Sequence, residues 1–235
     1  GETIAVQGMT VSTAVVAPTC PGGFDGTATV AVLSATAPIS YQWSIPGNTA
    51  TLTGLAAGAY SVTIMDSGSL PQSAILEVVV PEGTDETAPL ITCPPNQTIA
   101  ADATCAGTVG AWTLLSKTDN CTAPGAIAET QSPESGTVLS GHNDTKTVVL
   151  TATDSHEKSA SCSFTVTLKD VAPPIITCPA NQTVAVDASC AGVVGSHLAT
   201  SSSDLCGSPI VTQSPAANTV LTGHNTAQTV TLTAD

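Results

Sequence analysis

The chain of 235 residues contains 18 acidic residues but only four lysines and no arginine, so its formal net charge at pH 7 is -14. Double-stranded nucleic acid and anionic membranes bind to clustered basic surfaces, which four lysines cannot form, so we exclude both as partners. A field of this sign attracts cations such as calcium, although a net negative charge also simply keeps a surface protein soluble.

Short alternating runs of Val, Ile and Thr occur along the whole chain, and 16 prolines and 19 glycines separate them. Such runs are typical of strands with one buried face, and no segment keeps a helical apolar period for three turns. No apolar run approaches the roughly 18 residues that a membrane span requires. The sequence therefore predicts an all-β protein without membrane insertion.

The eight cysteines recur at repeated spacings and form no CxxC pair. This pattern favours disulfides over zinc ligands, and disulfides imply an oxidising, exported location. The chain begins inside a strand-like pattern without a signal peptide, so we interpret it as a mature fragment or an interior piece of a longer protein. We expect a secreted protein of the extracellular cell surface.

Residues 1–17 form one extended stretch that has nothing of its own to pack against, and an isolated strand is not stable in water. Residues 18–82 form a first module, in which turn signals separate alternating runs. Its large aromatic residues include Tyr41, Trp43 and Tyr60. The alternation places Tyr41 and Trp43 on one face, which favours packing in a core over an exposed sugar-binding cluster.

Residues 18–82 resemble the SprB-type repeat of large gliding-motility surface adhesins of bacteria. The matching residues form three runs, Asp25–Val30, Tyr41-x-Trp43 and Gly54–Asp66. In that family a cysteine after the last turn would pair with Cys20, but the corresponding turn of this chain contains none. The resemblance implies a β-sandwich repeat of a bacterial surface and leaves the partner of Cys20 open.

From residue 88 onward the chain repeats itself with a spacing of 85 residues. The spacing holds for three pairs of cysteines, Cys93 and Cys178, Cys105 and Cys190, and Cys121 and Cys206. Identity at a fixed period indicates one supersecondary unit that is used twice. We therefore assign a second module to residues 83–172, called the first repeat, and a third module to residues 173–235, called the second repeat.

Both repeats resemble the hyalin repeat (HYR module), an immunoglobulin-like sandwich of extracellular proteins. The match rests on four runs of the first repeat, Ile91–Pro94, Thr118–Cys121, Thr151–Asp154 and Ser161–Leu168. The resemblance implies an elongated row of immunoglobulin-like β-sandwich modules. The disulfides that it implies are Cys93 with Cys162, Cys105 with Cys121 and, by the same spacing, Cys190 with Cys206. Cys178 is left without a partner, and nothing in the geometry supports its pairing with Cys20.

The second repeat stops at Asp235, where the first repeat has reached only its penultimate strand. Residues 7–18 align without a gap with residues 162–173, the last strand and exit of the first repeat. We therefore predict that residues 1–17 complete the last module of another copy, or that the chain is one period of a longer tandem polypeptide. An arbitrary chain boundary is the simpler alternative. The residues of the predicted assembly strand are Thr10, Val11, Val15 and Val16.

No arrangement of residues converges on catalysis, and His142 lies in a Gly-His-Asn turn that both repeats share, so we predict no enzyme and no certain cofactor. Calcium is the one metal that we consider. The loops after the second strand and before the last strand of an immunoglobulin-like sandwich meet at one end, where oxygen ligands would suit a hard cation. The candidate ligands are Asp119, Asn120, Asp154 and Asp170. Turn formation is the simpler explanation of these residues.

Four sequons for N-glycosylation, at Asn96, Asn120, Asn143 and Asn181, are candidate sites for covalent glycans. Combining these features, we predict an extracellular structural protein that assembles head to tail with copies of itself. Head-to-tail contacts that do not close into a ring build a fibre, so we expect a bacterial surface fibre. The alternative is a cell-surface adhesin module that binds polysaccharide or another surface.

Overall fold

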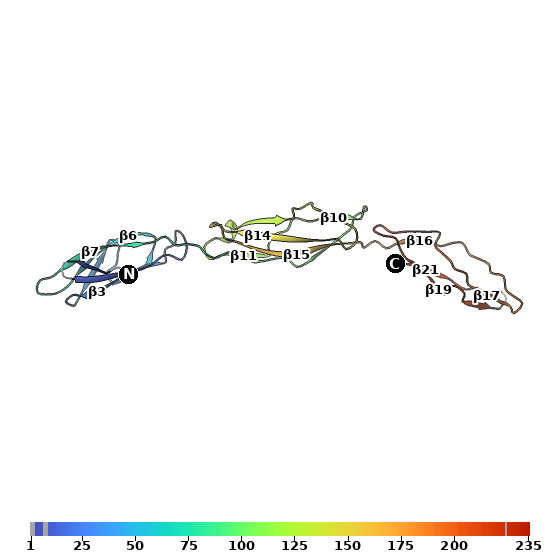
Figure 1. The fold of residues 1–235 in the computed structure, drawn as a ribbon, viewed down its shortest axis with the longest axis horizontal. Coiled ribbons are helices and arrows are strands. Elements are labelled where there is room, and N and C mark those ends of the chain that lie inside the picture. The colour runs from blue at the N-terminus through green and yellow to red at the C-terminus, as the bar shows by residue number, and fades with distance from the viewer. Residues whose placement is uncertain (1–2, 7–8, 224) are drawn as a thin grey trace. The chain divides into compact units, whose positions relative to one another are not determined.

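A computed structural model describes residues 3–6, 9–223 and 225–235 (Figure 1). Its regular structure consists of strands, and the described residues add only one short 3-10 helix, η1 (Pro124–Ala126). Across those same residues, no helix is long and apolar enough to cross a membrane. The prediction of an all-β chain of immunoglobulin-like sandwich modules is confirmed.

The chain divides into two compact units. The first unit runs up to Ile91 and includes Ser116–Glu129 and Ala152–Ala160, and the second unit consists of Thr92–Leu115, Thr130–Thr151 and the chain from Ser161 onward. Each unit has a hydrophobic core of its own.

Two sheets form a sandwich in the first unit, called the N-terminal sandwich. One sheet has the order β1-β2-β3-β5, with β1 (Thr3–Val6), β2 (Met9–Val16), β3 (Gly26–Ser34) and β5 (Thr51–Leu55). The other sheet has the order β4-β6-β7, with β4 (Ser40–Trp43), β6 (Gly58–Met65) and β7 (Ser73–Val80). Every second residue of β7 is buried, as expected for a strand that packs one face on a core.

The strand β2 is an inner strand of this sandwich. It pairs antiparallel with β3 along its length, with Val11 opposite Val32, and β1 pairs with its other edge. Met9 and Val11 are only 1% and 0% exposed, and both belong to the same core as side chains from the opposite sheet. Residues 9–16 are therefore used within their own module.

This position corrects the prediction for residues 1–17, of which residues 1, 2, 7 and 8 lie outside the described residues. The four residues of the predicted assembly strand, Thr10, Val11, Val15 and Val16, all lie in β2 and pair with β3. Withdrawing β2 to complete another copy would uncover the core that Met9 and Val11 close and would leave the edge of β3 unpaired. The prediction of a separate assembly strand is wrong, because strands of unrelated position share the same alternation of apolar residues.

The aromatic residues of the N-terminal sandwich pack as predicted. Trp43 is 6% exposed, and its Nε1 donates a hydrogen bond to the carbonyl oxygen of Thr49 at 2.9 Å. The hydroxyl of Tyr60 donates to the carbonyl oxygen of Ala56 at 2.9 Å, and both Tyr60 and Tyr41 pack against the core. These three rings stabilise the core, so they do not form an exposed platform for a sugar.

The first repeat contains one four-stranded sheet and two strand pairs. The sheet has the order β12-β14-β15-β9, with β12 (Ala128–Ser132), β14 (Thr145–Thr153), β15 (Ser159–Lys169) and β9 (Gln97–Ala100). The pairs are β8 (Leu90–Thr92) with β11 (Ser116–Thr118), and β10 (Ala106–Thr108) with β13 (Val138–Ser140). β15 runs parallel to β9, with Leu168 opposite Ile99. The side chains of Phe164, Val166 and Leu168 from β15 fill much of the core.

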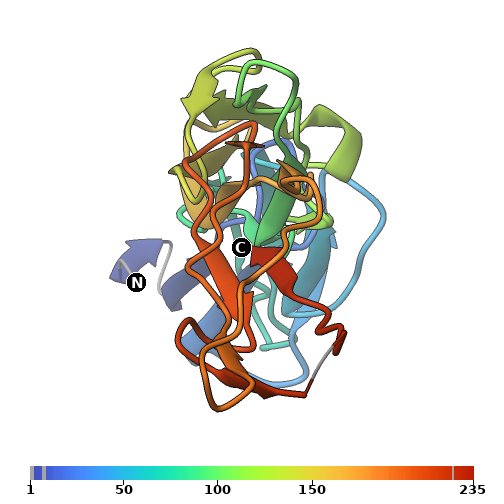
Figure 2. The ribbon, with the colours of Figure 1, turned by 90° about the vertical axis from the view of Figure 1, so that its right-hand side faces the viewer.

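The second repeat keeps the strand pairs but not the full sheet. Its pairs are β16 (Ile175–Thr177) with β18 (Ser201–Ser203), β17 (Ala191–Val193) with β20 (Val220–Thr222), and β19 (Val211–Ser214) with β21 (Thr231–Ala234). By sequence, the last pair corresponds to β12 and β14. The strands of this repeat, orange to red in Figure 2, are short and joined by long loops. Among its described residues no strand corresponds to β9 or β15.

Candidate functional site

Three disulfides connect six of the eight cysteines, and Cys178 and Cys190 are free and exposed. The pairs and their Cα–Cα distances are Cys93–Cys162 (5.8 Å), Cys20–Cys121 (5.4 Å) and Cys105–Cys206 (5.1 Å). The first pair is the one that the hyalin-repeat resemblance implied for the outer strands.

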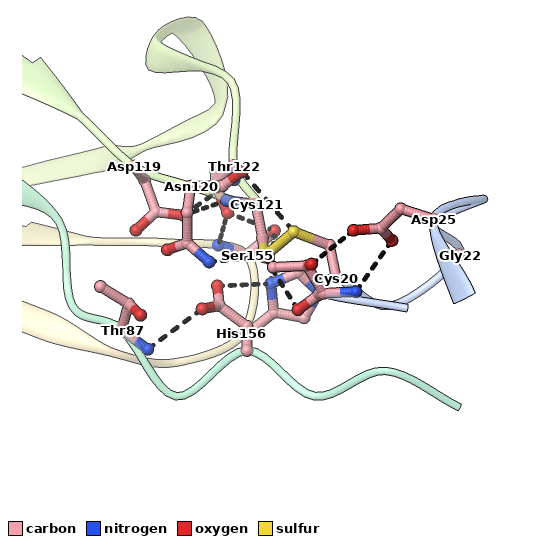
Figure 3. The surroundings of a disulfide bond; sticks show 12 residues. Cys20, Gly22, Asp25, Thr87, Asp119, Asn120, Cys121, Thr122, Ser155 and His156 are labelled. Carbon is pink, nitrogen blue, oxygen red and sulfur yellow. Dashed lines mark hydrogen bonds and ion pairs between the residues drawn. A yellow bond between two sulfur atoms is a disulfide. The ribbon is translucent and has the colours of Figure 1, made fainter. Parts of the chain in front are cut away.

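The expected pairings of Cys105 with Cys121 and of Cys190 with Cys206 are wrong. The resemblance implied bonds within one module, whereas Cys121 and Cys206 each bond to a cysteine 101 residues earlier in the chain. Cys121 follows a turn in which a carboxylate oxygen of Asp119 accepts its backbone N–H at 2.9 Å, and this turn meets the loop of Cys20 (Figure 3). Sequence spacing could not reveal this contact between separate loops.

Hydrogen bonds also fix the loop that carries Cys20. The backbone N–H of Thr19 donates to Asp25 Oδ1 at 2.9 Å, and the Thr19 hydroxyl donates to Asp25 Oδ2. The bond from the hydroxyl, followed by that from the backbone, holds the pKa of Asp25 below its ordinary value. A Cβ atom at Gly83 would lie 2.6 Å from the carbonyl oxygen of Cys20, so only glycine allows the chain to pass this loop. The disulfide is therefore held on a preorganised turn.

The loop after β11 is tied to the turn between β14 and β15. Asp119 Oδ2 accepts the backbone N–H groups of Cys121 and Thr122, at 2.9 and 2.8 Å. The hydroxyl groups of Thr122 and Ser155 lie 2.8 Å apart and share a hydrogen bond. These two loops meet at one end of the module, as the sequence predicted.

Three side chains that could hold a metal ion lie together in the first unit: Asp85, Asp154 and His156. One carboxylate oxygen of each aspartate and one ring nitrogen of the histidine all lie within 4.8 Å of one another. Asp85 lies between β7 and β8 with a side chain that is 0% exposed, and Asp154, in the turn that joins β14 to β15, is 6% exposed. We call these three residues the junction cluster.

The junction cluster differs from the predicted calcium ligands. It contains Asp154, but Asn120 is exposed and its side-chain amide donates to the sulfur of the next residue at 2.9 Å. Asp170 lies in the second unit, where its Oδ1 accepts a backbone N–H two residues further on. Asp119 is not one of the three clustered residues. The sequence contained a signal for the missed residue, because Asp85 lies one 85-residue period before Asp170.

An open groove with a volume of about 800 Å³ lies in the second repeat. Its lining residues lie in the segments 178–186, 192–197 and 221–232. Val184, which lines the groove, is 42% exposed, and Val186 is 45% exposed. At such exposure, these apolar side chains show that no element of the described chain covers this face of the repeat.

In the first repeat, β15 covers the equivalent face. Leu139 and Leu150, which line that core, are 0% and 1% exposed. Their sequence counterparts Leu221 and Leu232 line the groove and are only partly buried. The groove therefore has the position that β15 fills in the first repeat.

Three side-chain contacts anchor β15 in the first repeat. The groove keeps the same residue type for two of them and has a histidine in place of the tryptophan for the third. Asn96 Oδ1 accepts the backbone N–H of Thr165 at 2.9 Å, Trp112 meets the ring of Phe164 edge-on with centroids 5.4 Å apart, and Cys93 bonds to Cys162. The corresponding residues of the groove are Asn181, His197 and Cys178. The backbone N–H of His197 donates to the side chain of Gln213 at 2.7 Å, as that of Trp112 does to Gln131 at the same distance.

All four predicted sequons place their asparagine at the surface. The exposed residues are Asn96, Asn120, Asn143 and Asn181. The side-chain carbonyl oxygen of Asn96 accepts a hydrogen bond from β15, and its amide nitrogen takes no part in that bond. Glycosylation of these positions stays a prediction.

No protein-family model matches the chain, and no curated protein matches it either. Among solved structures, mouse cadherin-23 EC22-24 is 18% identical over 84% of this chain and 78% of that chain, with a TM-score of 0.36. The fibronectin(III)-like modules of Clostridium thermocellum CbhA are 15% identical over 68% of this chain and 95% of that chain, with a TM-score of 0.24. The protocadherin gammaB7 EC3-6 cis-dimer structure is 13% identical over 73% of this chain and 54% of that chain, with a TM-score of 0.29. At these scores the similarity carries no argument about function, which depends on the disulfides, the junction cluster and the groove.

Proposed function

We propose that this chain is a structural protein of an extracellular bacterial surface fibre, and that its second repeat joins the fibre by accepting an added β-strand. The single observation that carries the proposal is the open groove, which has the place of β15 and is lined by Asn181 and Cys178, the counterparts of two residues that anchor β15. An empty groove would leave an unpaired sheet edge, which promotes aggregation unless a partner covers it.

The strand that the groove fits has a definite pattern. In β15, Phe164, Val166 and Leu168 point into the core, and Cys162 precedes them at the same two-residue period. A strand with this pattern would place its cysteine near Cys178 and its aromatic ring near His197. Backbone pairing would supply affinity, and the alternating apolar side chains would supply specificity.

The donor of the strand is either a further segment of a tandem polypeptide or a separate chain. β2 does not serve as the donor, because it is paired in its own sandwich. Both remaining routes give a head-to-tail contact that repeats without closing and therefore builds a fibre. The three disulfides support an oxidising location outside the cell for such an assembly.

A synthetic peptide with the sequence of β15, residues 159–169, tests the proposal on the complete chain. In a glutathione redox buffer, the peptide should form a one-to-one mixed disulfide with Cys178, which intact-mass measurement and peptide mapping would detect. Cys190→Ser is the matched control, because Cys190 is also free and exposed but does not line the groove. This variant should capture the peptide as the wild type does, whereas Cys178→Ser should not.

A second peptide with serine in place of Phe164 and Val166 separates strand addition from thiol reactivity. The groove should capture this peptide at least tenfold less, because the two apolar side chains that would cover its floor are absent. Equal capture of both peptides, or capture mainly at Cys190, would show that the groove does not recognise a strand. Electron microscopy of the native material should show a filament with one chain per axial step.

A further inference from the structure

The junction cluster carries more buried negative charge than its hydrogen bonds satisfy. Asp85 Oδ1 accepts the backbone N–H of Thr87 at 3.1 Å, and Asp154 Oδ1 accepts those of His156 and Lys158 at 2.7 and 2.9 Å. The other oxygen of each carboxylate, Oδ2, is buried and accepts no hydrogen bond among the described residues. Leaving a buried carboxylate oxygen unpaired is strongly unfavourable.

Among the described residues, His156 is the one cationic side chain within ion-pair distance of these oxygens. His156 Nδ1 lies 3.2 Å from Asp85 Oδ2, which makes an ion pair when the imidazole is protonated, although its geometry is not that of a hydrogen bond. Lys158 is engaged elsewhere, with Nζ 2.8 Å from Glu86 Oε2. Lys158 attracts Asp85 and Asp154 only at longer range, so Asp154 Oδ2 has no hydrogen-bond or ion-pair partner among the described residues.

The geometry points to a binding site for a divalent cation at Asp85 and Asp154, with calcium as the ion. The unsatisfied atoms are carboxylate oxygens, which are the hard ligands that calcium prefers. A third buried oxygen without a partner, Oδ1 of Asp119, lies in the loop that the hydroxyl contact between Thr122 and Ser155 ties to the same turn. A bound cation would give these oxygens the partner that they lack among the described residues.

The role of His156 distinguishes calcium from zinc. An imidazole nitrogen is a ligand of zinc, so a zinc site would need His156. Calcium prefers oxygen ligands, so a calcium site at Asp85 and Asp154 would not need the imidazole. The side chain of His156 is 30% exposed, which gives the ring a route to solvent when the ion binds.

A bound ion would hold two separate segments of the first unit together. Asp85 belongs to the connection between β7 and β8, and Asp154 to the turn between β14 and β15. Figure 3 shows His156 beside the disulfide of Cys20 and Cys121. The cation would therefore reinforce, without a covalent bond, the same region that this disulfide crosslinks.

Calorimetry and thermal melting of the complete chain test the site with the metal ions alone. After treatment with EDTA, 10 mM calcium chloride should raise the Tm of the wild type by about 3–10 °C, as for an ion bound with a Kd of about 0.1–1 mM. Asp154→Asn should lose this rise. Asp170→Asn is the matched control, because Asp170 makes the same turn contact one period later and lies outside the cluster.

Further variants keep the test decisive. Asp85→Asn should also abolish the calcium effect, so the conclusion does not depend on whether Asp154→Asn folds. His156→Gln should keep the rise, because calcium takes oxygen ligands and does not need the imidazole. An unchanged Tm of the wild type in calcium, or the same rise in Asp85→Asn and Asp154→Asn, would overturn the site. A rise with zinc but not calcium that His156→Gln abolishes would overturn calcium as its ion.

Discussion

Replacing Cys20 and Cys121 together by alanine should strongly destabilise the N-terminal sandwich. The disulfide joins positions 101 residues apart, and constraining an unfolded loop of that length is worth about 4.7 kcal/mol. Both cysteines are replaced, so the variant gains no new free thiol. With a denaturant slope of about 3 kcal/mol per M in guanidinium chloride, the unfolding midpoint should fall by about 1.5 M.

Trp43 provides a local probe of this transition, because its ring is 6% exposed in the core of the N-terminal sandwich. The other tryptophan, Trp112, packs against Phe164 in the separate core of the second unit. A Trp112→Phe background therefore isolates the fluorescence of Trp43. Titration with guanidinium chloride in this background reports the unfolding of the N-terminal sandwich alone.

The matched control is the double alanine variant of Cys93 and Cys162. Its disulfide spans 69 residues, so its loss should cost about 4.4 kcal/mol in the transition that Trp112 reports. If the guanidinium midpoint reported by Trp43 is the same in the variant of Cys20 and Cys121 as in the wild type, the reasoning is refuted. Removal of the disulfide would then not have increased the conformational entropy of the unfolded chain.

Three further predictions follow from particular side chains. The wild type should contain two titratable thiols per chain under denaturing conditions without reductant, at Cys178 and Cys190, and a count of zero or four would contradict the observed pairing. Phe164→Ala should lower the stability of the first repeat by about 3–5 kcal/mol in thermal melting, because the ring is 4% exposed and its loss opens a cavity. Backbone N–H groups, first that of Gln72, hold the pKa of Asp66 below its ordinary value. The ionised carboxylate therefore adds to the free energy of unfolding in full above the pKa of the unfolded state, and this addition is lost as the pH falls through the pKa of the folded state. Asp66→Asn should therefore flatten the acid limb of a Tm–pH profile, and an unchanged slope would contradict this role.

The fold class could be predicted from local patterns. Apolar and polar residues alternate along a strand when one of its faces is buried. The strands β7 and β15 can therefore be predicted from the sequence without tertiary information. The 85-residue period likewise predicted that one sandwich unit is used twice. The pairing of Cys93 with Cys162 followed from the family resemblance, because it joins strands within one module.

The remaining features depend on which loops meet. The bond of Cys105 to Cys206 joins the two repeats, and a pairing rule that applies within one module cannot predict it. Asp85 was missed because its carboxylate is brought to Asp154 by the connection after β7, a contact that neither residue's neighbours in the sequence indicate. β2 was assigned to another copy because alternation identifies a strand but not its partner.

The overlap of two disulfides limits how far the chain can be stretched. Cys20–Cys121 and Cys105–Cys206 close intervals that overlap between Cys105 and Cys121. Tension applied to the two ends passes through one sulfur bridge, along the 16-residue separation between Cys105 and Cys121, and through the other bridge. The rest of the polypeptide between Cys20 and Cys206 bears no load until a covalent bond breaks. Mechanical unfolding between Cys20 and Cys206 would therefore release little length.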